Sequence, residues 1–141
     1  MNNTVTFSFT KGNNTESCTI DFNNRKINLN RHGFSYSING LINMEFSFND
    51  ITGIERIPQK LFSHEKYQFI LNGKRMCATE NTEIAVTVFT LSKSDIKTAY
   101  EVIQRLCKEC NLPEIKRLGQ IDATTEIYEY QYSPHLIGTT P

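Results

Sequence analysis

Apolar and polar residues alternate through most of the first ninety positions, and this pattern constrains the fold more than any other feature of the chain. Val5, Phe7 and Phe9 alternate with threonine and serine, and the segment from Cys18 to Phe22 repeats the pattern. A period of two places the apolar side chains on one face of a strand. The first ninety residues therefore predict a series of half-buried strands.

Short turn sequences separate these segments. Asn23-Asn24 predicts a hairpin over 16–30, and Asn39-Gly40 suits a type I′ turn, in which both central residues have positive φ. Asn72-Gly73 predicts a further hairpin. Residues 84–91 form a β-branched run that is apolar on both faces, which indicates a central strand.

After the last predicted strand the hydrophobic period lengthens to that of a helix. Ser92 and Asp95 resemble a capping box, Asn111 can adopt the left-handed conformation that ends a helix, and Pro113 prevents continuation. The pattern predicts one helix over 93–110. Its apolar stripe comprises Ile96, Ala99, Tyr100, Ile103, Leu106, Cys107 and Cys110.

The predicted fold class is α+β, mainly β, with antiparallel strands in a bent sandwich or partly open barrel capped by one C-terminal helix. One domain is expected over 1–113, with the helix at about 93–110, and 114–141 is expected to be a tyrosine-containing extension and flexible tail. A chain of 141 residues can bury a sizeable core without a disulfide or metal.

Charge and hydropathy argue against several classes of partner. Fifteen basic residues balance fifteen acidic ones, so the totals provide no basic face for nucleic acid. No apolar run is long enough to span a bilayer, and nothing specific supports contact with a membrane surface. The N-terminus alternates rather than forming the apolar segment of a signal peptide, so a cytoplasmic location is expected.

Cys107 and Cys110 form a CxxC motif that could supply half a zinc site or a redox pair. Both lie on the apolar stripe and in the last helical turn, where the helix dipole disfavours a thiolate. The other two cysteines, Cys18 and Cys77, come from separate predicted strands. We therefore expect buried core cysteines, and neither a metal nor a cofactor.

The remaining titratable residues suggest no catalytic site. The chain contains no nucleophile elbow, phosphate-binding loop or dinucleotide fingerprint. The histidines are expected to be solvated in loops or the tail: His32, His64 and His135. The acidic residues at strand ends and turns are expected to be solvated as well: Asp50, Glu55, Glu80 and Glu83.

Two groups of residues are candidates for partner binding. The first is basic and flanks predicted turns, where it could receive a phosphate or an acidic peptide if the turns share one end of the sheet, or could simply keep strand edges soluble. It comprises Arg25, Lys26, Arg31, Lys74 and Arg75. The second is a tyrosine-rich strand that could add to a sheet edge. It comprises Tyr128, Tyr130 and Tyr132.

The order of elements over 25–112, several antiparallel strands followed by one helix, resembles a bacterial pleckstrin-homology-like (PH-like) domain. The stretch from Asp50 to Ile54, Asp-Ile-Thr-Gly-Ile, is similar to a motif in a strand of those domains. The resemblance leaves out 1–22 and 114–141. It implies a non-catalytic module that binds a protein partner or a second copy, and Arg25, Lys26 and Arg31 match the family's phosphoinositide-binding pattern too loosely to carry that activity over.

Two other functions fit parts of the pattern. Many strands plus one C-terminal helix also suit a small apolar-ligand carrier with a lipocalin-like barrel, although the early Gly-x-Trp of that family is missing. A hydrolase whose site is assembled from scattered residues is the third hypothesis.

Overall fold

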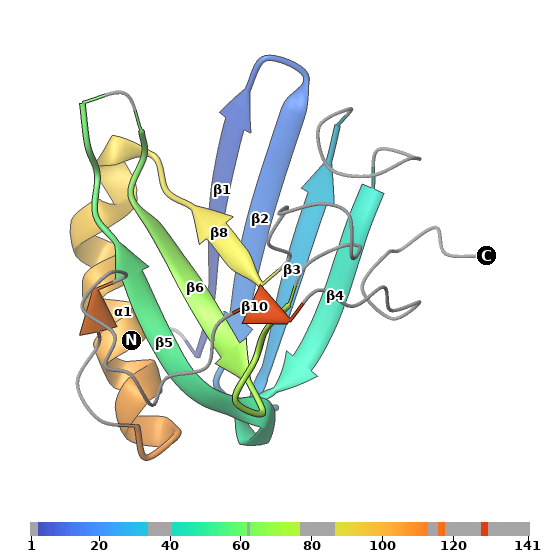
Figure 1. The fold of residues 1–141 in the computed structure, drawn as a ribbon, viewed down its shortest axis with the longest axis vertical. Coiled ribbons are helices and arrows are strands. Elements are labelled where there is room, and N and C mark those ends of the chain that lie inside the picture. Colours follow the sequence, from blue (N-terminus) through green and yellow to red (C-terminus); the bar gives the residue numbers. More distant parts are fainter. Residues whose placement is uncertain are drawn as a thin grey trace.

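The computed structural model describes residues 3–33, 41–61, 63–76, 87–112, 116–117 and 128–129. Strands dominate this part of the chain, and a single longer helix follows them (Figure 1). In chain order the elements are β1 (Thr4–Lys11), β2 (Asn14–Asp21), β3 (Lys26–His32), β4 (Leu41–Ser47), the 3-10 turn η1 (Phe48–Asp50), β5 (Ile51–Ile57), β6 (Lys66–Leu71), β7 (Arg75–Met76), β8 (Val88–Thr90), the 3-10 turn η2 (Lys93–Asp95), α1 (Ile96–Glu109), β9 (Lys116–Arg117) and β10 (Tyr128–Glu129).

The first sheet is an antiparallel meander in the order β1-β2-β3-β4. Its register aligns the apolar positions of all four strands, so that Phe7, Cys18, Leu29 and Met44 form one buried row. The predicted hairpin over 16–30 is confirmed, with β2 and β3 as its arms. Residues 1–22, outside the family resemblance, contribute two strands to this sheet.

The second sheet has the order β8-β6-β5-β9 and packs against the inner face of the first (Figure 1). β9 joins β5 in parallel, and β10 pairs in parallel with β7. Within the described residues the strands thus form separate sheets and no closed barrel. The mainly antiparallel α+β fold class is confirmed, and the described strands do not form the closed barrel that the lipocalin-like alternative expects.

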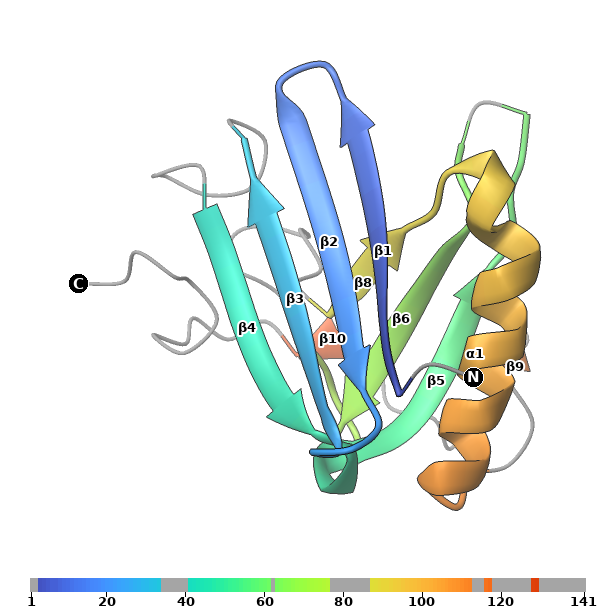
Figure 2. The same cartoon turned by 180° about the vertical axis from the view of Figure 1, so that it is seen from behind.

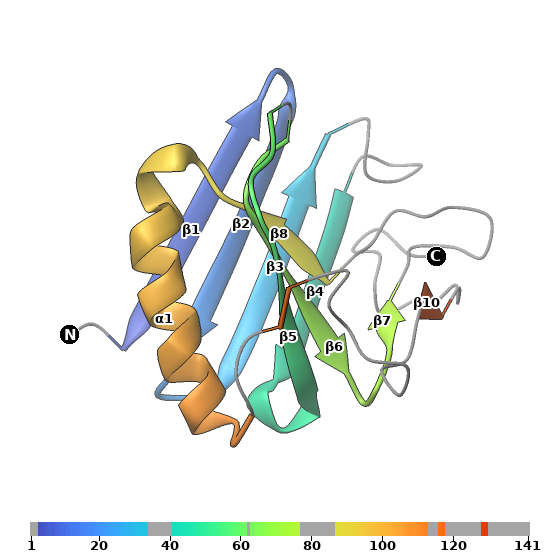
Figure 3. The ribbon, with the colours of Figure 1, turned by 60° about the vertical axis from the view of Figure 1, so that its left-hand side comes forward.

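Aromatic rings fill the space between the two sheets. Phe89 stacks on Tyr67 and Phe69, with ring centroids 5.8 and 5.7 Å apart, and on Phe7 of the facing sheet at 6.1 Å. Burying each such side chain contributes about 2–3 kcal/mol. Helix α1 lies beside this core, at the side of the molecule where β1 and β5 lie (Figure 3), and buries Ala99, Ile103, Leu106 and Cys107.

The turn chemistry follows the sequence closely. Asn72 and Gly73, where a hairpin turn is predicted, have φ of 52° and 83°, the positive values that a type I′ turn requires, and Asn111 has φ of 55° at the end of α1. The predicted Asn39-Gly40 turn lies outside the described residues.

Two details of the helix differ from the prediction. The Ser92 hydroxyl donates to Asp95 Oδ2 at 3.0 Å instead of accepting from the backbone, because residues 93–95 form the 3-10 turn η2 before α1 begins. Tyr100, predicted on the apolar stripe, is 41% exposed, and the guanidinium of Arg56 lies 5.8 Å from its ring.

The predicted central strand over 84–91 is also different. Residues 84–86 lie outside the described part, and β8 covers only Val88–Thr90. Within the described residues β8 pairs with β6 alone and ends the second sheet. Phe89 and Thr90 are buried although no described strand adjoins the other edge of β8, because residues of the first sheet contact it.

Candidate interaction surfaces

The predicted basic group does not form one surface. The turn before β3, the turn η1 and the turn after β6 meet at one end of the molecule, because Phe48 N donates to Arg25 O at 3.0 Å and Asn72 N donates to Asp50 O at 2.9 Å. Arg25, Lys26 and Lys74 therefore lie at this end. Arg31 lies toward the opposite end of β3, and the side chain of Arg75 is outside the described residues.

Arg25 fastens the helix to the first sheet. Its guanidinium contacts Glu109 at the end of α1, 3.2 Å from the carboxylate Oε1 and 3.2 Å from the main-chain oxygen, and lies 5.1 Å from the Phe48 ring. These contacts occupy the side chain within the fold. Arg25 therefore links the end of α1 to the turn before β3.

Arg31 is predicted as a surface residue that binds a partner, but its side chain is buried, with 5% of the residue exposed. Its guanidinium donates to the carbonyl oxygen of Val88 in β8. Glu16, the register partner of Arg31 on β2, accepts from Thr90 N at 2.9 Å with Oε1 and bonds Thr90 Oγ1 at 3.0 Å with Oε2. Two charged side chains of the first sheet thus contact one strand of the second.

These contacts fall on the outer edge of β8. Phe69 N donates to Thr87 O at 2.7 Å, and Leu91 N donates to Glu65 O at 2.9 Å. In an antiparallel ladder alternate residues face the partner strand, so the peptide groups of Val88 and Thr90 face away from β6. Glu16 and Arg31 bond those outward groups, and we call this arrangement the β8 seal.

The sequence contains a signal for the β8 seal that the charge-based reasoning missed. Glu16 is in phase with Cys18 and Ile20, and Arg31 is in phase with Ile27 and Leu29. A period of two therefore directs both charges toward the apolar face. A charged side chain is rarely buried unless it has a partner. The position of Glu16 and Arg31 in the alternating pattern therefore predicts that both bond other groups inside the fold.

The first sheet ends at β1 on one side and at β4 on the other (Figure 2). β1 lies on the side nearer α1, and Asn3 just before it accepts from Arg105 Nη2 at 3.3 Å. Because Phe48 N donates to Arg25 O, even-numbered residues of β4 face β3 and odd-numbered residues face outward. Within the described residues no strand pairs with this outward edge at Asn43 or Glu45.

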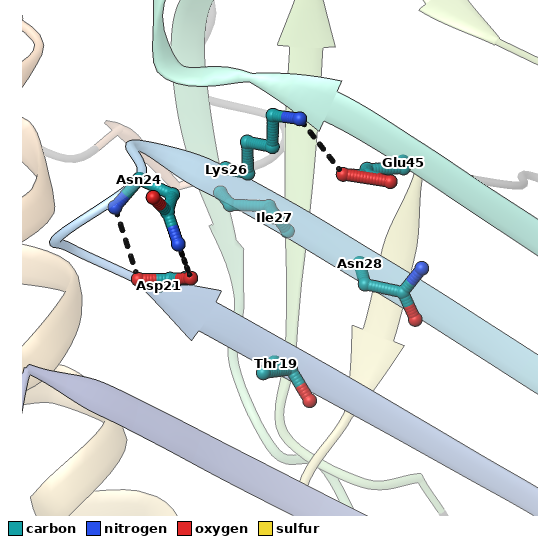
Figure 4. Close-up of a pocket in the computed structure, with 7 residues that line it drawn as sticks. All are labelled: Thr19, Asp21, Asn24, Lys26, Ile27, Asn28 and Glu45. Atoms are coloured by element: carbon teal, nitrogen blue, oxygen red, sulfur yellow. Dashed lines mark hydrogen bonds and ion pairs between the residues drawn. The ribbon is translucent and has the colours of Figure 1, made fainter.

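The outer face of the first sheet has a shallow polar hollow (Figure 4). Its walls hold satisfied polar groups: Asp21 accepts from the backbone of Asn23 and Asn24 at 3.0 and 3.1 Å, and Lys26 Nζ lies 3.5 Å from Glu45 Oε1. Hydrogen bonds, chiefly from the Asn24 side chain, lower the pKa of Asp21. The lining residues are Thr19, Asp21, Asn24, Lys26, Ile27, Asn28 and Glu45.

The described cysteines are part of the core. Cys18 and Cys107 are buried, Cys110 is half-buried, and burial raises the pKa of Cys107 and Cys110 to about 11. In the described part of the chain no three His, Cys, Asp or Glu side chains gather as a metal site would need. Cys77 lies outside that part.

One other predicted environment needs correction. Glu55 is 1% exposed rather than solvated, because it lies within β5 instead of at a turn. His32 is exposed, as predicted, at the last position of β3, and His64 lies in the connection between β5 and β6 with its ring 4.8 Å from that of Phe9. Asp50 lies in the turn η1, where it accepts from Ser47 N at 3.2 Å. His135, Glu80 and Glu83 lie outside the described residues.

The tyrosine-rich segment is described only in part. Tyr128 lies in β10 and pairs in register with Arg75 of β7, so this residue joins a strand of its own chain. Tyr130 and Tyr132 lie outside the described residues. The helix in the described part of the chain is too short to cross a bilayer.

Comparison of the chain with protein-family models, with curated proteins and with solved structures found no match. The surfaces above therefore have to be interpreted from their own chemistry.

Proposed function

We propose that this protein is a non-catalytic interaction module that binds an extended segment of protein chain along the outward edge of β4. One observation carries the proposal. The peptide groups of Asn43 and Glu45 face away from β3, and no described strand pairs with them, whereas the outward edge of β8 is bonded by side chains. An open edge offers main-chain donors and acceptors to an added strand.

The proposal includes a relationship to PH-like domains. A meander of four antiparallel strands, a second antiparallel group and a following helix support it. Domains of this kind act as binding modules, which agrees with a role at a sheet edge. The proposed site does not use Arg25 or Arg31, because both have structural contacts.

A proline substitution tests the proposal. Asn43→Pro removes an outward N–H that bonds nothing in the first sheet, so the fold should tolerate it while strand addition is lost. Ser8→Pro is the matched control. Because Phe22 N donates to Asn3 O, the peptide groups of even-numbered residues in β1 also face outward, at the opposite edge of the same sheet.

Short random peptides displayed on phage are selected against the immobilised wild-type protein. We expect the selected peptides to bind the wild type and the Ser8→Pro variant but not Asn43→Pro, with circular dichroism confirming that all three fold. Equal binding to Asn43→Pro, or no selected binder at all, would contradict the proposal.

The tyrosine-containing extension remains a separate prediction. If Tyr128, Tyr130 and Tyr132 bind a partner or a second copy, deletion of 114–141 should change the mass measured by light scattering or the capture of the partner. An unchanged mass and unchanged capture would exclude an interaction role for the extension.

A further inference from the structure

We propose that the segment bound at the β4 edge is β4 of a second copy, in antiparallel pairing centred on Met44. This inference rests on the proposed function at the same edge. The four strands of each copy would then form one continuous sheet of eight strands about a two-fold axis.

The backbone permits few symmetric registers. Outward-facing residues of one copy must meet outward-facing residues of the other, so the axis passes through a residue. Both Asn43 and Glu45 find partners within Leu41–Ser47 when that residue is Asn43, Met44 or Glu45. An axis at Glu45 places two carboxylates directly opposite, which is unfavourable. An axis at Asn43 places Glu45 opposite residue 41. Only the axis at Met44 pairs Asn43 of each copy with Glu45 of the other.

A side-chain hydrogen bond and an ion pair leave a donor and an acceptor for this pairing. Asn28 Nδ2 donates to Asn43 Oδ1 at 3.1 Å, so this bond uses the amide oxygen of Asn43 and not its NH₂ group. Glu45 contacts Lys26 through Oε1 at 3.5 Å, which leaves Oε2 to accept. Each copy therefore presents one donor and one acceptor, and the two-fold axis brings them together twice.

The inner side of the edge is compatible with the same axis. Met44 and Phe46 are 8% and 6% exposed and face the core, so pairing extends the apolar layer of one copy into that of the other. Met44 would face Met44 of the second copy in a non-hydrogen-bonded pair, where side chains approach closely. A single short strand pair buries less than about 1,200 Å², which is typical of weak, reversible association.

Sedimentation velocity on the full chain, from about 5 µM to about 500 µM, tests the inference. We expect a concentration-dependent monomer–dimer equilibrium. Asn43→Lys should tighten it about three- to tenfold by creating two Lys–Glu pairs, and Asn43→Glu should weaken it at least as much by opposing two carboxylates. Lysine cannot accept from Asn28 Nδ2 and glutamate can, so loss of the bond to Asn28 would favour the Asn43→Glu dimer, opposite to the effect expected from the cross-strand charges.

A chain that stays monomeric throughout, or a dimer that responds equally to Asn43→Lys and Asn43→Glu, would overturn the inference. Amide hydrogen exchange gives a second measurement: protection of the amides at positions 43 and 45 should rise with concentration in the wild type and in Asn43→Lys, and should rise least in Asn43→Glu. If the protein is monomeric but selected peptides still need Asn43, the second copy is the wrong partner and the proposed function stands. If no selected peptide binds and no dimer forms, both fail.

Discussion

The edges of β8 and β4 show two ways in which the same chain treats an unpaired strand. At β8 the outward peptide groups are bonded by Glu16 and Arg31, which are 9% and 5% exposed. At β4 the outward side chains are Asn43 and Glu45, both exposed, and no described strand bonds the backbone between them.

The difference lies in where each edge ends. The β8 edge terminates inside the molecule, under the inner face of the first sheet, where an unbonded peptide group would cost about 1–3 kcal/mol. The β4 edge terminates at the side of the first sheet farther from α1 (Figure 2), where no described strand bonds the same groups. A sealed edge therefore contributes to stability, and an open one can contribute to binding.

The largest expected effect comes from removing the carboxylate of the β8 seal. Glu16→Ala leaves the Thr90 N–H and hydroxyl without their acceptor and Arg31 without its neighbouring negative charge, so the free energy of unfolding should fall by about 3–5 kcal/mol. Urea denaturation measures it. Glu45→Ala, the same change at the exposed β4 edge, should lower the free energy of unfolding by less than about 0.5 kcal/mol. Equal losses in the two variants would mean that the β8 edge is not stabilised more than the β4 edge by its carboxylate.

Hydrogen exchange compares the main-chain amides of the two strand edges directly. In dilute protein the Thr90 amide, bonded at 2.9 Å to a buried carboxylate, should exchange about 10²–10³-fold more slowly than the Asn43 amide. Residue-resolved NMR exchange provides the rates. Comparable protection at both positions in monomeric protein would mean that the β4 edge is already covered.

A smaller effect, of opposite sign, is expected beside β8. Tyr67 is fully buried, and its hydroxyl has no hydrogen-bond partner in the described part of the chain. Burial also raises the pKa of Tyr67 above its usual range, so the group stays neutral. Tyr67→Phe should therefore stabilise the protein by about 1 kcal/mol in thermal or urea unfolding. Tyr100→Phe, at an exposed ring, should change nothing measurable, and destabilisation by Tyr67→Phe would indicate an unseen partner.

The smallest effect concerns acid stability on the open outer face. Hydrogen bonds from Asn24 lower the pKa of Asp21 in the folded protein below 3.8, the usual value for an aspartate side chain. The charged form is therefore favoured by folding, so its contribution is present above pH 3.8 and is lost as pH falls through the folded-state pKa. Asp21→Asn should flatten the fall in urea midpoint below about pH 4. An unchanged pH profile would contradict this role.

Much of the fold could be predicted because local patterns decide it. The period of two, the Asn72-Gly73 turn and the left-handed Asn111 depend on residues close together in the chain, and each is found in the structure. The candidate site was predicted less well. Charge alone suggested Arg25 and Arg31 as surface residues, yet one fastens the helix and the other enters the core.

The sequence by itself determined which residues share a face: its phase places Glu16 and Arg31 with the apolar positions, and Asn43 and Glu45 with the polar ones. Only the tertiary structure decided that β4 ends a sheet and that β8 ends beneath one. Side-chain phase follows from the local backbone, but the neighbour of a strand depends on residues distant in the chain. Whether an edge is sealed or open therefore appears only after the sheets have packed.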